Sequence, residues 1–454
     1  MLGVQVQPWS MRYFATALVS VMLALAWLVA IPLVTPGTLG SPLTLVAVHL
    51  TVIGWMSLLM LGALHQFVPV IATRRLWNDA LPAWTLGLVA GGLIGMLVGF
   101  LGLATGPLQG MALAPPLLPI GGGAVVIGFT LAIVNLGLTL FAARPLSLSA
   151  RYVASALGFS FLTVLLGLTF ALAFSGSGLL PPALAPLIGA ALPLHILAGV
   201  AGWLTLTAMG VALKLLSMFM LSPEERGALG ELAWMVAAGG VAIGWTSGIV
   251  GLLVASAWMA DLSLAGWCLL GAGVILYLID MRRLYRSRRR RRLELNARLG
   301  AWALACLGVT SLLVLMAWAG QGRDPAWIIA SVYLALFGWL GGLGLSQLYK
   351  IVPFLTWIER YGRRMGRERV PLVQDLVNED RAMPYYVLYF AAVGVGTASL
   401  GLGLSLWFHL AQAVTLVAVA GISRELWRIR HGHRVGVVAS PLAQVTGSGQ
   451  GLSS

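Results

Sequence analysis

Three histidines with the chemistry of metal ligands lie inside long apolar stretches of the sequence: His49, His195 and His409. Polar side chains in such stretches are costly and tend to mark function. Imidazole nitrogens bind heme iron axially and bind copper in pairs or triplets. Each histidine lies about six to eight residues inside its stretch, and a rise of about 1.5 Å per residue puts all three in the outer third of a membrane. They form a metal site if they face one another; the alternative is that each imidazole hydrogen-bonds a neighbouring helix.

A second polar group lies deeper in the same kind of stretch. His65 follows His49 by 16 residues, which is roughly 24 Å along a helix. It shares its level in the sequence pattern with four other polar side chains, Gln66, Lys214, Tyr349 and Lys350. This cationic group, which lacks carboxylates, predicts a polar vestibule that passes protons or holds an anion. The alternative is that the two lysines extend to the lipid headgroups.

The histidines belong to a pattern that occurs three times, over residues 49–70, 195–219 and 333–354. The copies align on three Gly-Trp pairs, Gly54-Trp55, Gly202-Trp203 and Gly338-Trp339. Small residues recur eight positions after each glycine, at Gly62, Gly210 and Ser346. An internal repeat of this kind determines architecture, and small residues let helices approach closely in lipid.

Composition assigns the chain to a membrane. Hydrophobic residues make up 59% of the 454 residues and charged residues 9%, which excludes a soluble protein of this length. Runs of roughly 20 apolar residues are each long enough to cross a bilayer as a helix. Twelve are predicted: 14–35, 43–71, 83–105, 118–143, 152–175, 187–220, 230–258, 262–281, 299–319, 326–357, 384–400 and 402–423.

The three copies fall on the second, sixth and tenth of these helices, so the repeating unit is four helices. We predict an all-α fold with one transmembrane domain over residues 1–434. Its repeat units run over about 12–143, 152–282 and 299–424, and a disordered cytoplasmic tail follows over 435–454.

Basic residues identify the side of the membrane on which the chain ends. They gather in alternate connections, for example Arg74 and Arg75, Arg144 and Arg151, and the run from Arg288 to Arg292. The opposite connections, such as TPGTLGSP, are nearly uncharged. Basic loops stay in the cytoplasm, so both termini are predicted there. The net charge of +14 is thus a topology signal that fits anionic lipid and predicts no nucleic-acid partner.

Twelve helices in three four-helix arcs, with polar residues on helices 2, 6 and 10, resemble the catalytic subunit I of the heme-copper oxidase superfamily. That superfamily includes cytochrome c oxidase and the large subunit of nitric oxide reductase. The resemblance covers residues 12–425 and implies that His49, at the outer face of the second helix, is a heme ligand. It implies the same kind of position for His195 on the sixth helix.

The chain departs from that family in its ligand set. Subunit I of an oxidase uses a histidine pair on helix 7 and two histidines on helix 10, and the stretches 230–258 and 326–357 contain none. A complete binuclear centre therefore cannot assemble, and oxygen reduction by this chain is not expected.

Two classes of function fit these observations. The first is a membrane protein that binds heme b or copper through His49, His195 and His409, with His49 and His195 as the best candidates for metal ligands. It would act in electron transfer, gas handling or cofactor delivery in a bacterial inner membrane, with respiratory-chain or redox subunits as partners. The second is a metal-free transporter or channel on the same bundle, without any cofactor.

Overall fold

The computed structural model describes residues 8–104, 114–176, 178–223, 227–319, 324–365 and 370–432. Within these residues the regular secondary structure is helical, and twelve helices are long and apolar enough to cross a membrane. The all-α prediction and the twelve predicted spans are confirmed. The predicted disordered tail, residues 435–454, lies outside the described residues.

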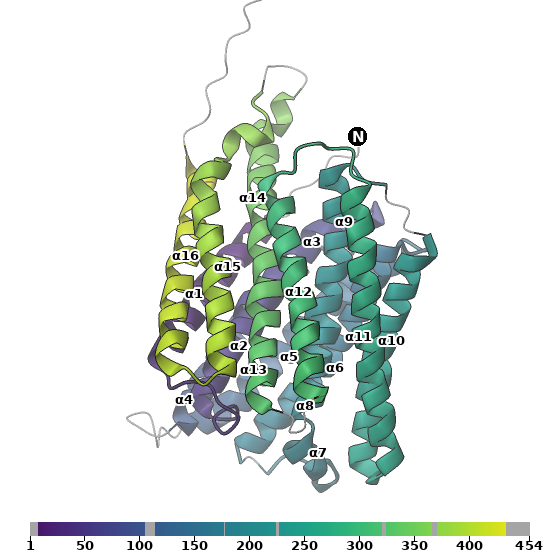
Figure 1. Ribbon diagram of the computed structural model, residues 1–454. Helices are drawn as coiled ribbons and strands as arrows, with labels where there is room; N and C mark the ends of the chain where they lie inside the picture. Colours follow the sequence, from purple (N-terminus) through teal and green to yellow (C-terminus); the bar gives the residue numbers. More distant parts are fainter. Residues whose placement is uncertain are drawn as a thin grey trace, which may run out of the picture.

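The spans form three consecutive sets of four (Figure 1). The first set consists of α1 (Ser10–Ala30), α2–η1–α3 (Pro42–Ala72), α4 (Leu81–Leu103) and α5 (Ala114–Phe141). The second set consists of α6 (Leu148–Phe174), α8–η3–α9 (Leu192–Met220), α10 (Gly227–Val254) and α11 (Ala257–Arg286). The third set consists of α12 (Leu295–Ala319), α13–η4–α14 (Pro325–Tyr361), α15 (Glu379–Gly401) and α16 (Ser405–His431). Four short helices lie in the connections: η2 (Pro182–Leu184), α7 (Ala185–Ala190), η5 (Gly362–Arg364) and η6 (Val373–Leu376).

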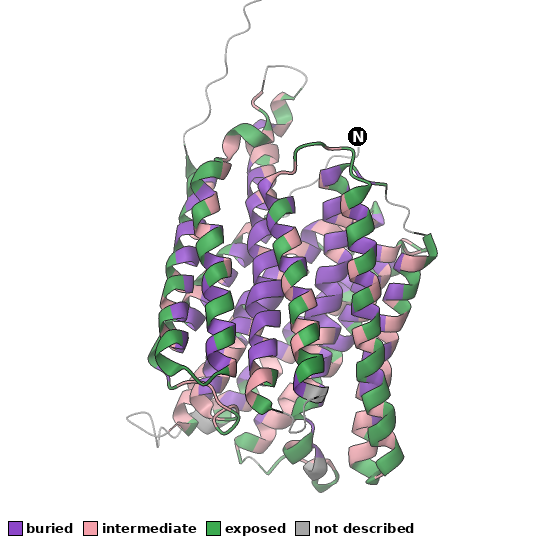
Figure 2. Cartoon of the chain, in the orientation of Figure 1, coloured by how far each residue is buried: buried purple, intermediate pink, exposed green. Residues whose placement is uncertain are grey.

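The second helix of each set forms the centre of the bundle. In these three helices 72–78% of the most apolar window is buried, against 28–44% in the other nine. Figure 2 shows the contrast, because α14 is buried over most of its length while α12 and α15 beside it carry exposed stripes. The outer nine helices therefore present apolar surface to lipid, and the central three are enclosed by protein.

Each central helix contains a π-helical segment at the Gly-Trp pair. The segments are η1 (Leu50–Ser57), η3 (Leu197–Thr205) and η4 (Leu334–Gly341). The π-helix is rare, and it is frequently found at functional sites. Its occurrence at the same place in all three copies agrees with the internal repeat.

Glycines let the first helix of a set pack closely on the second. A Cβ added at Gly62 would lie 2.5 Å from Cβ of Tyr13, and one added at Gly210 would lie 2.6 Å from Cβ of Tyr152. The two contacts are equivalent in the repeat, so α1 crosses α3 as α6 crosses α9. The third copy has Ser346 at this position.

Some predicted boundaries were wrong. Helix α15 begins at Glu379, five residues early, because Asn378 Oδ1 accepts a hydrogen bond from the Arg381 amide (2.9 Å) and caps the helix. Helix α16 runs to His431 and not to residue 423. Its charged last turns stay helical because Glu425 is buried between two arginines, Arg381 (2.6 Å) and Arg428 (2.7 Å).

Candidate functional site

His49 is the last residue of α2 and directly precedes the first π-helical segment. Its Nδ1 lies 2.7 Å from the carbonyl oxygen of Leu45. A carbonyl only accepts hydrogen bonds, so Nδ1 carries the proton and Nε2 keeps a free lone pair. The ring centroid lies 5.0 Å from that of Phe100 on α4. The ring is thus held in one orientation with its ligating nitrogen available.

His195 lies in α8, two residues before the second π-helical segment. Its Nδ1 is buried and has no hydrogen-bond partner among the described residues. Helix α6 supplies the wall behind the ring. A Cβ added at Gly167 would lie 3.1 Å from Cε1 of His195, and the ring of Phe170 stands edge-on at 5.6 Å between centroids. Gly167 therefore makes room for the imidazole in a largely apolar pocket.

The two imidazoles stand at the same end of two central helices. They come from different copies of the repeat and stand five and seven residues before their Gly-Trp pairs. Each helix changes from α to π between the histidine and that pair. The pair of rings, with one uncommitted nitrogen each, is the feature on this face with the chemistry of a ligand site.

His409 has a different environment. Its Nε2 lies 2.9 Å from the carbonyl oxygen of Ile31, and its Nδ1 lies 3.4 Å from Oγ of Ser405. Both ring nitrogens are therefore engaged between α16 and the end of α1. The third copy has Tyr333 at the position of His49, and Gln412 Nε2 donates a hydrogen bond to its hydroxyl (2.9 Å).

No group of three or more histidine, cysteine, aspartate or glutamate side chains in the described part of the chain is arranged to hold a metal ion. The arrangement therefore offers two imidazoles and not the histidine triplet of a copper centre. Two imidazoles suit either a copper ion or a heme iron.

The tryptophans of the three π-helical segments are buried at equivalent positions of the three copies. Trp203 Nε1 donates a hydrogen bond to Oγ of Ser57 (2.9 Å), which joins the second copy to the first. Trp55 and Trp339 are completely buried, and their indole nitrogens have no partner in the described structure. A Cβ added at Gly344 would lie 3.6 Å from Trp55, so that ring reaches the third copy. Large buried aromatic side chains thus occur on all three central helices at this level.

The predicted inner polar group is distributed over several environments. His65 is fully buried with its ring centroid 5.6 Å from that of Tyr13, Gln66 is buried, and Lys214 is half-buried. Tyr349 and Lys350 instead line a cavity of 760 Å³ at the arginine-rich end of the bundle. Only these two of the five predicted residues are among the residues that line it.

Lys350 forms an ion pair in that cavity. Its Nζ lies 2.5 Å from Oε2 of Glu294 and 5.2 Å from the ring centroid of Phe219. Arg290 pairs with the same carboxylate. Burial opposes ionisation of Glu294, but the hydrogen bond and charge of Lys350, with the charge of Arg290, outweigh it and hold the pKa of this carboxyl below its ordinary value.

Sequence reasoning missed the acidic partners of this cavity. Glu294 stands alone at the end of the arginine run and directly precedes α12, and that isolated acid was the available signal. Glu379 lies 85 residues later, and nothing local connects it to the run. The cavity is assembled by contacts between distant parts of the chain.

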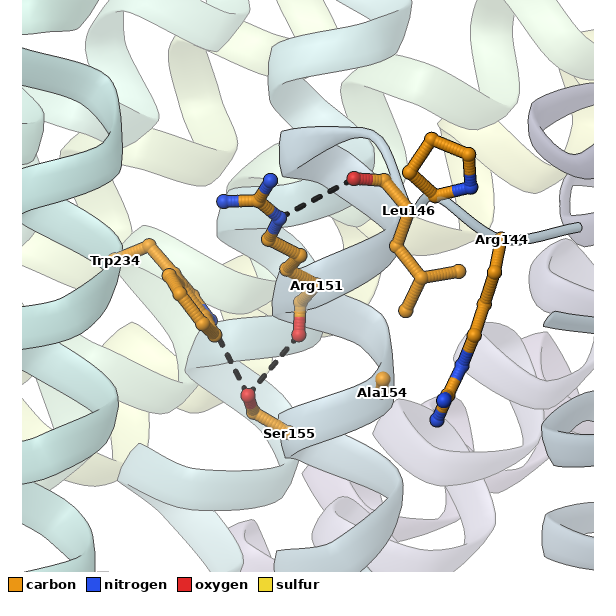
Figure 3. Close-up of a pocket in the computed structure, with 7 residues that line it drawn as sticks. Arg144, Leu146, Arg151, Ala154, Ser155 and Trp234 are labelled. Carbon is orange, nitrogen blue, oxygen red and sulfur yellow. Dashed lines mark hydrogen bonds between the residues drawn. The ribbon is translucent and has the colours of Figure 1, made fainter. Parts of the chain in front are cut away.

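A second cavity, of 640 Å³, lies beside α6 and α10 (Figure 3). Arg151 Nε donates a hydrogen bond to the carbonyl oxygen of Leu146 (3.2 Å), and Trp234 Nε1 donates one to Oγ of Ser155 (3.2 Å). These polar groups of its wall bond to one another, so it is a weaker candidate for a ligand site.

No protein-family model matches the chain, and no curated protein matches it.

Proposed function

We propose that this chain is an integral membrane protein that holds one redox-active metal, a copper ion or a heme iron, between His49 and His195. It then serves electron transfer, gas handling or cofactor delivery, with a redox protein as partner. The observation that carries the proposal is that two imidazoles, each directly before or two residues before a π-helical segment of a central helix, retain an uncommitted ring nitrogen.

The residues fit such a centre. The bond from His49 Nδ1 to the Leu45 carbonyl is the kind of second contact that orients a metal-binding histidine and raises its basicity. His195 contributes Nδ1, which is buried and otherwise costly to leave unpaired. Phe100 and Phe170 surround the pair with apolar surface, which limits access of water. A bound copper or heme iron would supply one-electron redox chemistry; this chain would position it.

The ligand set supports a function other than oxygen reduction. Two imidazoles complete neither the copper site of an oxidase nor its two heme sites, and the described residues hold no cluster of three ligands. His409 is engaged with Ile31 and Ser405, so it is not needed as a third ligand. We expect oxygen consumption by the purified protein, with a quinol or cytochrome donor, to match that of His49→Ala.

A metal-free transporter or channel is the alternative. A conduction path between the three central helices would have to pass the level of Trp55, Trp203 and Trp339, which are 0%, 3% and 0% exposed. Interiors this densely packed do not admit solutes without rearrangement. The tryptophans therefore favour the metal-binding proposal over an axial channel.

The test is metal and heme content of protein purified from cells supplied with both. Copper is measured by mass spectrometry and heme by the pyridine hemochrome. Wild type should hold close to one equivalent of one of them, and His49→Ala and His195→Ala should each lose it. His409→Ala is the matched control and should retain it. Substoichiometric copper and heme in wild type, or equal retention in all three variants, would move the assignment to the transporter class.

A further inference from the structure

The 760 Å³ cavity, here called the basic pocket, has a composition that differs from the rest of the bundle. It lies between the arginine-rich connection, the beginnings of α12 and α15, the segment η6 and the inner part of α14. Its lining contains six basic and three acidic side chains. They are Arg288, Arg290, Arg291, Arg292, Arg298 and Lys350, with Glu294, Glu379 and Asp380.

Two of the three acidic side chains form ion pairs with basic residues of the same lining. Glu294 pairs with both Lys350 and Arg290 and accepts a hydrogen bond from Gln374 (3.0 Å). Glu379 pairs with Arg298 (3.0 Å) and also accepts a hydrogen bond from the backbone amide of Leu295 (2.9 Å). The wall of the pocket is therefore held by ion pairs.

Arg291 and Arg292 take no part in these ion pairs. Both side chains are exposed, and the described part of the chain offers them no acidic partner. Two guanidinium groups at the rim of a cavity present several parallel N–H donors, and this geometry matches phosphate oxygens. The rim therefore carries positive charge that the protein itself does not neutralise.

The inner wall contains an independent sign of a ligand. Asn296 lines the pocket and is 2% exposed, yet its side-chain oxygen has no hydrogen-bond partner in the described structure. Its amide nitrogen makes only a long contact of 3.5 Å to Gln347. Buried polar groups normally have partners, and an amide oxygen only accepts hydrogen bonds, so this oxygen is placed to meet a hydroxyl or ammonium group of a headgroup that enters the pocket.

We propose that the basic pocket binds a phosphate-bearing anion, namely the headgroup of an anionic phospholipid. The pocket lies where α12 begins its crossing, which is the level of lipid phosphates in a chain that spans the membrane. Basic pockets between membrane helices on the cytoplasmic side are a recurrent form of headgroup site. A volume of 760 Å³ accommodates a headgroup with two phosphates as well as a single phosphate. This proposal is independent of the metal centre.

The experiment uses the full chain in phosphatidylcholine nanodiscs, with cardiolipin added as the anionic lipid. Retained lipid is measured by native mass spectrometry, and thermal stability is followed in parallel. We expect cardiolipin to be retained and to raise the apparent Tm. The double variant R291Q/R292Q should weaken retention at least tenfold.

The matched control is R74Q/R75Q, which removes two exposed arginines that are not part of the pocket lining. It should leave cardiolipin retention unchanged, whereas a general attraction to the surface would fall equally in both variants and would overturn the proposal. Retention that no substitution alters would overturn it too.

A titration with inorganic phosphate and pyrophosphate distinguishes a lipid headgroup from a free anion. Soluble phosphate binding that depends on Arg291 and Arg292 would support the same pocket with a free anion as its occupant.

Discussion

The two ends of the bundle use polar side chains in opposite ways. At the end with His49 and His195, the two imidazoles pack against the rings of Phe100 and Phe170. At the other end, where α12 begins and α16 ends (Figure 1), charges are abundant, and Glu294 pairs with two cations. An imidazole nitrogen without a partner is therefore unusual at the first end, whereas charged residues are common at the second end.

This difference explains why the two ends support different kinds of inference. In an apolar region each unpaired polar atom loses its hydration without compensation, so the free ring nitrogens of His49 and His195 are informative when they are taken together. In a region rich in arginine, surface charges attract and screen one another, and an exposed ion pair contributes little. There the informative observations are the excess of arginines over acids and the buried amide of Asn296.

The largest effect should come from the scaffold that both ends share. In Gly62→Ala the new methyl group would lie 2.5 Å from Cβ of Tyr13, close to the backbone of α1, so the helices must separate. Overpacking of this kind costs about 1–3 kcal/mol. Gly158→Ala is the control, because a Cβ there meets nothing within 4 Å. We expect Gly62→Ala to lower the apparent Tm, which is measured by size exclusion after heating. We expect the metal content to fall with it. Equal stability of the two variants would show that the copies are not packed this way.

A smaller and more local effect is expected from Glu294→Gln. The substitution leaves Lys350 and Arg290 facing each other without their shared carboxylate, at a cost of about 1–2 kcal/mol. Metal content at the histidine end should not change. Glu231→Gln is the control, since Glu231 is half exposed in its pair with Arg151 and should matter little.

The same variant has a defined pH dependence. The pKa of the Glu294 carboxyl is lower in the folded protein than its ordinary value of 4.5. A lowered pKa means that the carboxylate stabilises the fold above pH 4.5 and that this contribution is lost as pH falls through the folded pKa. Wild type should therefore be more stable than Glu294→Gln at pH 7, and the two should converge below pH 4.5. A constant difference in Tm across this range would contradict the ion-pair assignment.

Much of the fold was predictable because its signals are local. Twelve apolar runs and the repeated Gly-Trp pairs sufficed for the helix count and for the three sets of four helices. Helix ends were harder to predict, because charged residues were assigned to the connections between helices. The beginning of α15 and the last turns of α16 are charged, and they are helical because distant residues pair there, as Arg381 does with Glu425.

The candidate site was only partly predictable. The sequence predicted His49 and His195 as ligands, and on an α-helix their offsets of five and seven residues from the Gly-Trp pairs would point in different directions. The intervening residues are π-helical in the structure, so α-helical steps do not apply. The π-segments carry no recognised local signature, and the basic pocket depends on contacts between residues some 80 positions apart, such as Arg298 with Glu379. Neither can be derived from periodicity.

The smallest effect concerns the link between the two copies that carry the histidines. Trp203→Phe removes the hydrogen bond to Ser57 but keeps an aromatic ring against Phe129, whose centroid lies 5.8 Å away. Hydrogen bonds between membrane helices contribute about 0.6 kcal/mol on average. Trp339→Phe is the matched control, because the indole nitrogen of Trp339 has no partner in the described structure.

A double-mutant cycle with Ser57→Ala isolates this bond. If it joins the first and second copies, the effects of Trp203→Phe and Ser57→Ala on the free energy of unfolding will be less than additive by about 0.6 kcal/mol. Trp339→Phe combined with Ser57→Ala will be additive. Because His49 and His195 stand just before the joined segments, the first pair should also loosen metal retention slightly, whereas Trp339→Phe should not. Additivity in both cycles would mean that the histidine pair is positioned by packing alone.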